Sequence, residues 1–274
     1  MDFNIRLSNR QVLRGMIKSP GNEMKAVIIM VHGLGEHINR YTDLSARFIS
    51  RKIGFAGVDL PGHGHSEGRR GHISSYRLLD EMAGILVSEC RKTFPGIPLF
   101  LYGQSLGGTI VLHYLLNRNP GVKGAIVTSP WLKLSFEPDR AKVRIASIVN
   151  HIMPGLQQPA GLKAEHLAHD KNIVEKYRTD PDNHGKISVG LFINSLRAAT
   201  EILQNASSLS VPLLLMHGTD DQICSPEGSR EFASKTGKAE LKLWEGGFHE
   251  LHNEPFREEV FEYTMNWIKS RIDN

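Results

Sequence analysis

Ser105 is the residue whose surroundings most clearly suggest chemistry. It lies in the sequence GQSLG at residues 103–107, directly after the apolar run Pro98–Tyr102. A strand that turns sharply into a helix would present the serine hydroxyl at the turn, and glycines two residues to either side leave room where a Cβ would clash. A hydroxyl held in this way is a candidate nucleophile, although the five-residue pattern alone also occurs in ordinary turns.

A serine nucleophile needs a base that accepts its proton and an acidic group that orients the base. Candidates for both follow it in the chain. The apolar run 211–216 leads into Asp220 and Asp221, and the run Leu241–Trp244 leads into His249. Each group therefore comes just after a predicted strand, at the sheet edge where open α/β sheets place their sites. The order serine, acid, histidine fits a nucleophile elbow, and either aspartate could be the acid.

Backbone N–H groups must also stabilise the oxyanion that forms when a nucleophile attacks a carbonyl. The N–H of Leu106 directly follows the serine at the start of a predicted helix over 106–117, where the helix dipole adds a favourable field. The second donor should come from the loop after an early strand. The run Ala26–Val31 ends in HGLGEH at residues 32–37, whose glycines allow close backbone approach. We predict that Leu34 supplies the second N–H.

Short apolar segments alternate with helical patterns along the chain, and these elements must position the candidate groups. The predicted strands are 26–31, 55–58, 99–102 and 124–128. Each is bounded by glycine or proline and is apolar throughout, which is typical of a parallel sheet covered on both faces. Segment 74–94 has the spacing of an amphipathic helix. The alternation predicts an α/β fold, with a mostly parallel central sheet and helices on both faces.

The alternation is interrupted once, for about eighty residues, which is too long for a plain loop. This stretch contains two amphipathic pieces, 142–153 and 188–203. We therefore expect a core formed by residues 1–130 and 209–274, with a helical cap inserted at residues 131–208.

Composition narrows the classes of function. The 274 residues carry a net charge of +4 and are 40% hydrophobic, as in ordinary globular proteins. Lys and Arg form no run longer than a pair, so we expect no nucleic-acid partner. Cys90 and Cys224 make no disulfide framework, which favours a reducing compartment. The first residues lack a signal pattern and the apolar runs are too short to cross a bilayer, so we predict a cytoplasmic protein without an obligate protein partner.

Two histidines raise the question of a metal. His63 and His65 form an H-x-H pair that could ligate zinc, but no cysteine or carboxylate set with metal-ligand spacing accompanies them. The glycine-rich loop accounts for the pair without a metal, so we predict neither a metal nor a cofactor. We expect Glu36 and Arg40 to hold the 32–37 loop through a hydrogen-bonded pair.

Three segments make the pattern specific to a family. They are HGLGEH at 32–37 with Arg40 and Tyr41 after it, DLPGHGHSEG at 59–68, and GQSLGG at 103–108. Together they resemble the monoacylglycerol lipase and lysophospholipase branch of the α/β-hydrolases, and the similarity extends through nearly the whole chain. The resemblance implies hydrolysis of an acyl ester through an acyl-enzyme, without a cofactor, beneath a mobile apolar cap that covers an acyl tunnel.

The resemblance also selects the acid. The family's acid follows a G-x-x-D pattern, which maps onto residues 218–221 and selects Asp221. A cysteine three residues after the acid resembles the mammalian monoacylglycerol lipases, and here it is Cys224. Its role is left open at this point, because reactivity depends on exposure and pKa.

We predict a serine hydrolase that cleaves carboxylic esters of single-chain lipids. Ser105 attacks, His249 transfers the proton, Asp221 orients His249, and the amides of Leu34 and Leu106 bind the oxyanion. The predicted substrate contacts are Gly33, Val143, Val149, Ile152 and Ile223.

Several alternatives stay open from the sequence. The apolar stripe within 143–153 could pack against the core instead of lining an acyl entrance. The cap could also make transient contact with a membrane or micelle surface. The same catalytic groups would serve a short-chain carboxylesterase, a thioesterase or a peptidase. A non-catalytic ligand-binding protein with the same fold is a further alternative.

Overall fold

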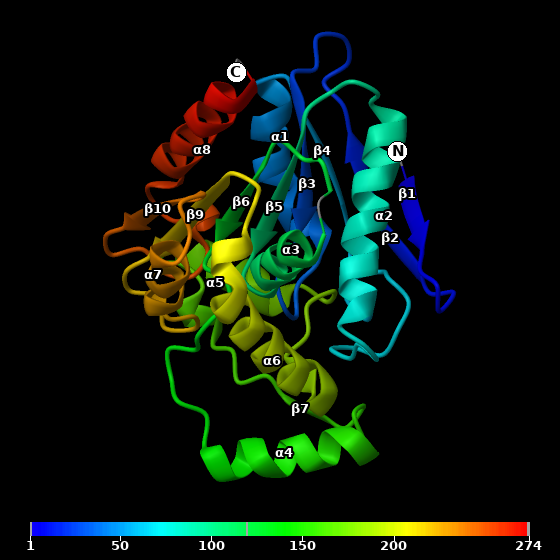
Figure 1. The fold of residues 1–274 in the computed structure, drawn as a ribbon, viewed down its shortest axis with the longest axis vertical. Helices are drawn as coiled ribbons and strands as arrows, with labels where there is room; N and C mark the ends of the chain where they lie inside the picture. Colours follow the sequence, from blue (N-terminus) through cyan, green and yellow to red (C-terminus); the bar gives the residue numbers. More distant parts are fainter. Residues whose placement is uncertain (1, 119, 273–274) are drawn as a thin grey trace.

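A central sheet organises the computed structural model, which describes residues 2–118 and 120–272. Within these residues, eight strands pair in the order β1-β2-β4-β3-β5-β6-β9-β10 (Figure 1). They are β1 Asp2–Arg6, β2 Val12–Lys18, β3 Ala26–Val31, β4 Ile53–Val58, β5 Leu99–Gln104, β6 Gly124–Thr128, β9 Leu213–Gly218 and β10 Ala239–Trp244. The β1–β2 and β2–β4 pairs are antiparallel and the other neighbours are parallel. The predicted mostly parallel α/β fold is confirmed.

Helices cover both faces of this sheet, because alternate side chains of each strand point to opposite sides. The odd-numbered residues of β3 share a core cluster with three helices: α2 (Arg77–Thr93), α3 (Leu106–Asn117) and α7 (Pro226–Ser234). Its even-numbered residues share a second cluster with α1 (Thr42–Ser50) and α8 (Arg257–Ile272). Every residue of β3 is buried, as expected for a strand that is covered on two sides. None of the described helices combines the length and apolarity of a membrane span.

The chain leaves the sheet between β6 and β9. There it forms α4 (Arg140–Ile152), β7 (Gln157–Pro159), η2 (Ala164–His166), α5 (Lys171–Thr179), β8 (Lys186–Ser188), α6 (Val189–Asn205) and η3 (Ala206–Ser208). Helix α6 packs against α3, and α4 packs against α6 from the outside, so that α4 lies at the edge of the molecule (Figure 1). No residue of α4 is buried. This stretch is therefore mostly helical, with one small antiparallel pair formed by β7 and β8.

The carboxyl ends of the parallel strands meet at one edge of the sheet. Val31 at the end of β3 pairs with Gly103 near the end of β5, and Trp244 at the end of β10 pairs with Gly218 at the end of β9. The loops that leave these four strands carry all the groups discussed next. Two 3-10 turns, η1 (Ile38–Tyr41) and η4 (Leu251–Asn253), follow two of the loops.

Candidate active site

Ser105 occupies the sharp turn between β5 and α3. Its φ of 54° lies in the left-handed region that non-glycine residues rarely adopt. A Cβ on Gly107 would lie 2.0 Å from the carbonyl oxygen of Val31, and one on Gly103 would lie 2.5 Å from that of Gly107. Both glycines are thus required by close backbone packing. The strained turn presents the Ser105 side chain at the edge of the sheet.

His249 and Asp221 form a buried pair at the same edge. The Nδ1–H of His249 donates to Oδ2 of Asp221 at 2.7 Å. Burial alone would lower the pKa of His249, but the charge of Asp221 and this hydrogen bond outweigh it and raise the pKa. Burial would raise the pKa of Asp221, but the charge of His249 and the hydrogen bonds from His217 and His249 hold that pKa well below its usual range. Asp221 is therefore an anion that orients a histidine.

The carboxylate of Asp221 is fixed by further donors. Its Oδ1 accepts the backbone N–H groups of Ile223 at 2.8 Å and Cys224 at 3.0 Å. Its Oδ2 also lies 3.1 Å from Nε2 of His217, a buried histidine whose role the sequence did not suggest. Asp220, by contrast, is exposed and accepts only from its neighbour Thr219. The structure thus places Asp221, and not Asp220, beside His249.

His217 is in turn held by Ser229 at the start of α7. The Nδ1 atom of His217 lies 2.7 Å from Oγ of Ser229. Both residues are fully buried. A histidine at the end of a buried strand, four residues before an acidic group, is the sequence signal that could have identified this support.

Ser105 and the loop that carries His249, which follows β10, are neighbours. Nε2 of Gln104, the residue before Ser105, donates to the backbone carbonyl of His249 at 3.4 Å. Among the described residues the Ser105 hydroxyl interacts with the Cys224 thiol, and no hydrogen bond joins it to His249. Bonds between a nucleophile and its base often tighten only when substrate is bound.

Cys224 is buried beside Ser105, and its surroundings raise the pKa of its thiol. Burial raises the pKa of its thiol well above the ordinary value, and the negative charge of Asp221 raises it further. The hydrogen bond with Ser105 opposes this shift without cancelling it. Because the reactive form of cysteine is the thiolate, this raised pKa disfavours reaction at Cys224.

Two backbone N–H groups beside Ser105 lack protein acceptors. A Cβ on Gly33 would lie 3.2 Å from Cβ of Ser105, so the 32–37 loop runs directly against the serine. Leu34 follows in this loop and Leu106 follows the serine. Both residues are buried, and among the described residues their N–H groups donate to no protein atom. The N–H of Leu106 is free because it begins a helix, and both groups are thus available to a carbonyl oxygen of a ligand.

The 32–37 loop is fixed by side chains within and beneath it. Gly33 N–H donates to Oε1 of Glu36 at 2.6 Å. Nδ1 of His32 donates to the carbonyl of Gly33 at 2.8 Å, and Nε2 of His32 accepts the N–H of Leu60 at 2.9 Å. Burial lowers the pKa of His32, so it is neutral, and these two bonds set its tautomer. The backbone that carries Leu34 is therefore held in place before any ligand binds.

A buried network of ion pairs connects the 32–37 loop to the loop that carries His249. Arg40 pairs with Glu36, as expected from the sequence, and also with Glu250, which the sequence did not suggest. Nη1 and Nη2 of Arg40 lie 2.7 and 2.9 Å from the two carboxylate oxygens of Glu250. Burial would raise the pKa of Glu250, but Arg40 lowers it to about 2. Because Glu250 directly follows His249, the network ties the two halves of the site together.

A cavity of about 270 Å³ opens onto Ser105. Its lining residues are mostly apolar or aromatic: Leu34, Ser105, Trp131, Leu134, Phe136, Ala160, Gly161, Leu162, Lys163, His166, Ile187, Phe192, Gln222, Ile223 and Cys224. Ile223 therefore lies where the sequence placed a substrate contact, and Gly33 lies against the serine. A larger cavity of about 490 Å³ lies between α1, α5 and α8, and Ser105 does not line it.

Three expected substrate contacts are absent from the lining of this cavity. Val143, Val149 and Ile152 lie on α4, which packs against α6, and Ile152 is 75% exposed. They therefore lie outside the lining of this cavity, and a contact with substrate at an acyl entrance stays a prediction. Helical spacing locates an apolar stripe on a helix, but it does not say which surface that stripe meets. The wall is formed instead by aromatic residues after β6 and on α6, including Trp131 and Phe192.

Comparisons with known proteins agree with this arrangement. Residues 22–256 match the family model Hydrolase_4, described as serine aminopeptidase, S33. An uncharacterized abhydrolase domain-containing protein of Dictyostelium discoideum is 34% identical over 276 residues, which cover 99% of this chain, but the chain spans only 29% of that relative's length. The monoacylglycerol lipase of Mycolicibacterium smegmatis is 30% identical over 258 residues, covering 93% of this chain and 91% of the relative.

A solved monoacylglycerol lipase structure is also similar to this chain. The crystal structure of Paleococcus ferrophilus monoacylglycerol lipase superposes with a TM-score of 0.86 at 30% identity, covering 94% of this chain and 99% of the other. Because the family model matches most of the chain and these relatives share its fold, the chain belongs to the Hydrolase_4 (serine aminopeptidase, S33) family of the α/β-hydrolases, with monoacylglycerol lipases among its homologues.

Proposed function

We propose that this protein hydrolyses the carboxylic ester of a single-chain lipid, such as a monoacylglycerol or a lysophospholipid. The observation that carries the proposal is the pair of unpaired N–H groups, on Leu34 and Leu106, at the serine end of an apolar cavity. These donors suit a developing oxyanion, and the aromatic walls suit an acyl chain. The similarity to monoacylglycerol lipases supports the same substrate class.

The proposed reaction has two stages, the formation of an acyl-enzyme on Ser105 and its hydrolysis by water. The Ser105 oxygen attacks the ester carbonyl while its proton passes to Nε2 of His249, and Asp221 stabilises the imidazolium that forms. The oxyanion accepts from Leu34 and Leu106 until the C–O bond breaks and the alcohol leaves with the proton from His249. Water, activated by His249, then attacks the acyl-enzyme, and the carboxylic acid and free Ser105 are released.

The stretch 131–208 is proposed as a cap over this cavity. It supplies many of the lining residues, from Trp131 to Phe192. The outer face of α4 exposes three isoleucines, Ile145 at 61%, Ile148 at 64% and Ile152 at 75%. Exposed basic residues on the same helix accompany them, namely Arg140, Lys142 and Arg144. We propose that this face touches the surface of a membrane or micelle that holds the substrate.

A substrate panel tests the proposed activity. The purified protein is assayed on monoacylglycerols of increasing chain length, lysophospholipids, p-nitrophenyl acetate and butyrate, acyl thioesters and aminoacyl p-nitroanilides. We expect the highest kcat/KM on a medium- or long-chain monoacylglycerol or lysophospholipid. A preference for acetyl or butyryl esters would support a short-chain esterase, and a preference for thioesters or aminoacyl anilides would support a thioesterase or a peptidase.

Covalent labelling separates an enzyme from a binding protein. A fluorophosphonate reacts only with an activated serine, so we expect mass spectrometry to find one adduct, on Ser105. An intact protein that remains unlabelled under conditions that label a known serine hydrolase would favour a non-catalytic ligand carrier.

A further inference from the structure

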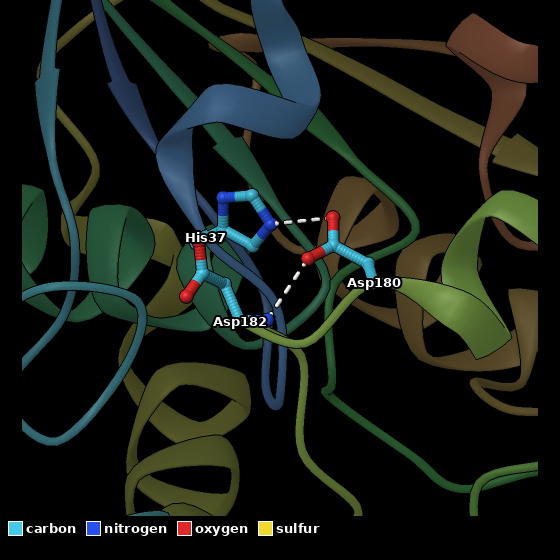
Figure 2. A group of neighbouring side chains, drawn as sticks. All are labelled: His37, Asp180 and Asp182. Atoms are coloured by element: carbon cyan, nitrogen blue, oxygen red, sulfur yellow. Dashed lines mark hydrogen bonds and ion pairs between the residues drawn. The ribbon is translucent and has the colours of Figure 1, made fainter.

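A second group of chemically competent side chains lies on the other side of the 32–37 loop. His37, Asp180 and Asp182 each direct a potential ligand atom to one place, and these atoms all lie within 4.8 Å of one another (Figure 2). Nε2 of His37 is 2.9 Å from Oδ2 of Asp180. His65 lies beside this group, since its Nε2 is 3.0 Å from Oδ2 of Asp182, but it is not one of the three residues whose ligand atoms all lie within 4.8 Å of one another.

These four residues come from three distant segments of the chain. His37 ends the loop after β3, and His65 lies in the glycine-rich loop after β4. Asp180 and Asp182 lie in the turn that follows α5, within the proposed cap. The sequence predicted no metal because no carboxylates accompany His65 at metal-ligand spacing. In the folded protein, the turn that follows α5 brings Asp182 to His65.

We propose that His37, Asp180 and Asp182 bind one Zn²⁺ ion, and that the exposed side chain of His65, which contacts Asp182, turns toward the ion to supply the fourth ligand. Two imidazoles and two carboxylates form a ligand set that zinc accepts in tetrahedral sites. With bonds of about 2.0–2.1 Å, neighbouring ligand atoms of such a site lie about 3.3 Å apart. The 2.9 and 3.0 Å contacts are close to this separation. Zinc would replace the protons that now lie between each histidine and its aspartate.

The charges favour a divalent cation. As ligands, the two aspartates carry a charge of −2 and the two neutral imidazoles carry none. Among the described residues no lysine or arginine forms an ion pair with either aspartate. Arg40 acts on Asp180 from a distance, but its guanidinium is already paired with Glu36 and Glu250.

Hydrogen bonds already position the two loops and the turn that carry the proposed ligands. Asp59 holds both histidine loops, since its Oδ2 accepts the N–H of His65 at 2.8 Å and its Oδ1 accepts the N–H of Ile38 at 2.7 Å. Oδ1 of Asp180 accepts the N–H of Asp182 at 2.9 Å, which fixes the turn that carries both carboxylates (Figure 2). Such supporting bonds orient ligands around a metal.

The exposure of the ligands suits a site that an ion can reach. His37 is buried, and its Nε2, which faces Asp180, is the ring nitrogen placed to bind an ion, while its Nδ1 has no hydrogen-bond partner among the described residues. The side chains of Asp180 and Asp182 are each 27% exposed and that of His65 is 58% exposed. An ion bound here would join the proposed cap to the loop that carries Leu34. The inference does not depend on the chemistry at Ser105.

Zinc titration of the full chain tests the site. After removal of metal with a chelator, calorimetry with ZnCl₂ should give one ion per chain. At free zinc a hundredfold above Kd, Tm should rise by about 5 °C. Co²⁺ in the same site should show the intense visible absorption of a tetrahedral ion. Absence of saturable zinc binding at micromolar concentrations, or of these cobalt bands, would overturn the proposal.

Paired variants assign the ion to these ligands. The double variant His65→Gln and Asp182→Asn removes two partly exposed ligands and should weaken zinc affinity by more than about tenfold. The control, His151→Gln with Asp220→Asn, removes an exposed histidine and an exposed aspartate outside the cluster and should bind zinc like the parent chain. Circular dichroism of the metal-free proteins verifies that both fold. Equal affinity in the ligand variant and the parent would place the ion elsewhere and refute the assignment.

Discussion

Arg40 forms a two-point ion pair with Glu250, the residue that follows His249. The same guanidinium pairs with Glu36, whose other oxygen accepts the N–H of Gly33 in the loop that carries Leu34. One buried cation therefore holds the loop of the proposed oxyanion donor and the loop of the proposed base at a fixed separation. The loops that follow two strands distant in sequence, β3 and β10, are thus joined through charge.

Removal of that cation should destabilise the whole fold. Arg40→Met leaves two buried carboxylates without their partner, which costs about 3–5 kcal/mol of the free energy of unfolding. Urea denaturation followed by circular dichroism measures this change. The matched control is Arg51→Met, which breaks an ion pair with Glu262 in which both side chains are nearly half exposed. Such exposed pairs contribute at most about 1 kcal/mol. Equal losses in the two variants would show that the Arg40 network is dispensable.

The proposed triad predicts that substitution of Asp221 lowers kcat far more than substitution of its neighbour Asp220. Asp221→Asn should lower kcat by about ten-thousand-fold, since His249 loses the anion that fixes its tautomer. Asp220→Asn should leave kcat near that of the parent, because Asp220 is exposed and, among the described residues, the hydrogen bond of its carboxylate is to Thr219 and not to His249. Ser105→Ala should lower kcat by several orders of magnitude. Steady-state ester hydrolysis measures all three variants. A severe Asp220 variant with a mild Asp221 variant would move the acid by one residue.

Much of the site could be predicted because its signals are local. Close packing at Gly103 and Gly107 requires glycine on both sides of Ser105, so the elbow is visible in five residues. The choice between Asp220 and Asp221 was not available from the residues alone, since both follow the same strand. The family resemblance selected Asp221, and the physical difference between the two is the turn that brings the N–H groups of Ile223 and Cys224 onto the Asp221 carboxylate.

Other features depend on contacts between distant segments. Glu250 could be recognised only once the loop after β10 was placed beside Arg40, and Asp182 only once the turn after α5 met His65. The stripe on α4 lies outside the lining of the cavity at Ser105, and the sequence could not show this because an amphipathic pattern does not identify its partner. Val143 and Val149 are partly buried on a helix that packs against α6, whereas Ile152 is exposed.

The raised pKa of His249 sets the expected pH dependence. The base must be neutral in the free enzyme, so kcat/KM should rise with pH through a pKa above the ordinary value of 6.5. Asp221→Asn removes the charge that raises this pKa, so the inflection should move to lower pH while the maximum rate falls. Rates measured across pH with a soluble ester test both effects. An inflection that stays in place in the variant would show that Asp221 does not control the protonation of His249.

The lowered pKa of Glu250 predicts how the free energy of unfolding falls at acid pH. Its pKa is about 2 in the folded protein and is close to the ordinary carboxyl value of 4.5 in the unfolded chain. Because the folded pKa is depressed, the stabilisation is present above the unfolded pKa and is lost as pH falls toward 2. Glu250→Gln should therefore have lower stability than the parent at neutral pH and a smaller loss of stability between pH 5 and about 2. Urea midpoints across this range measure the difference, and parallel curves for the two proteins would contradict it.

The exposed face of α4 should matter only for substrates held in a surface. A triple variant, Ile145→Ser, Ile148→Ser and Ile152→Ser, removes apolar contact without touching the cavity, because none of these residues lines it. We expect weaker binding to lipid vesicles in a flotation assay, and slower hydrolysis of long-chain monoacylglycerol in vesicles. Hydrolysis of a soluble short ester should be unchanged. The control, Lys171→Ser with Lys176→Ser, removes exposed side chains of α5 and should bind vesicles like the parent. Equal losses on the soluble and the vesicle-held esters would mean that α4 acts on the site itself, and the proposed surface contact would then be rejected.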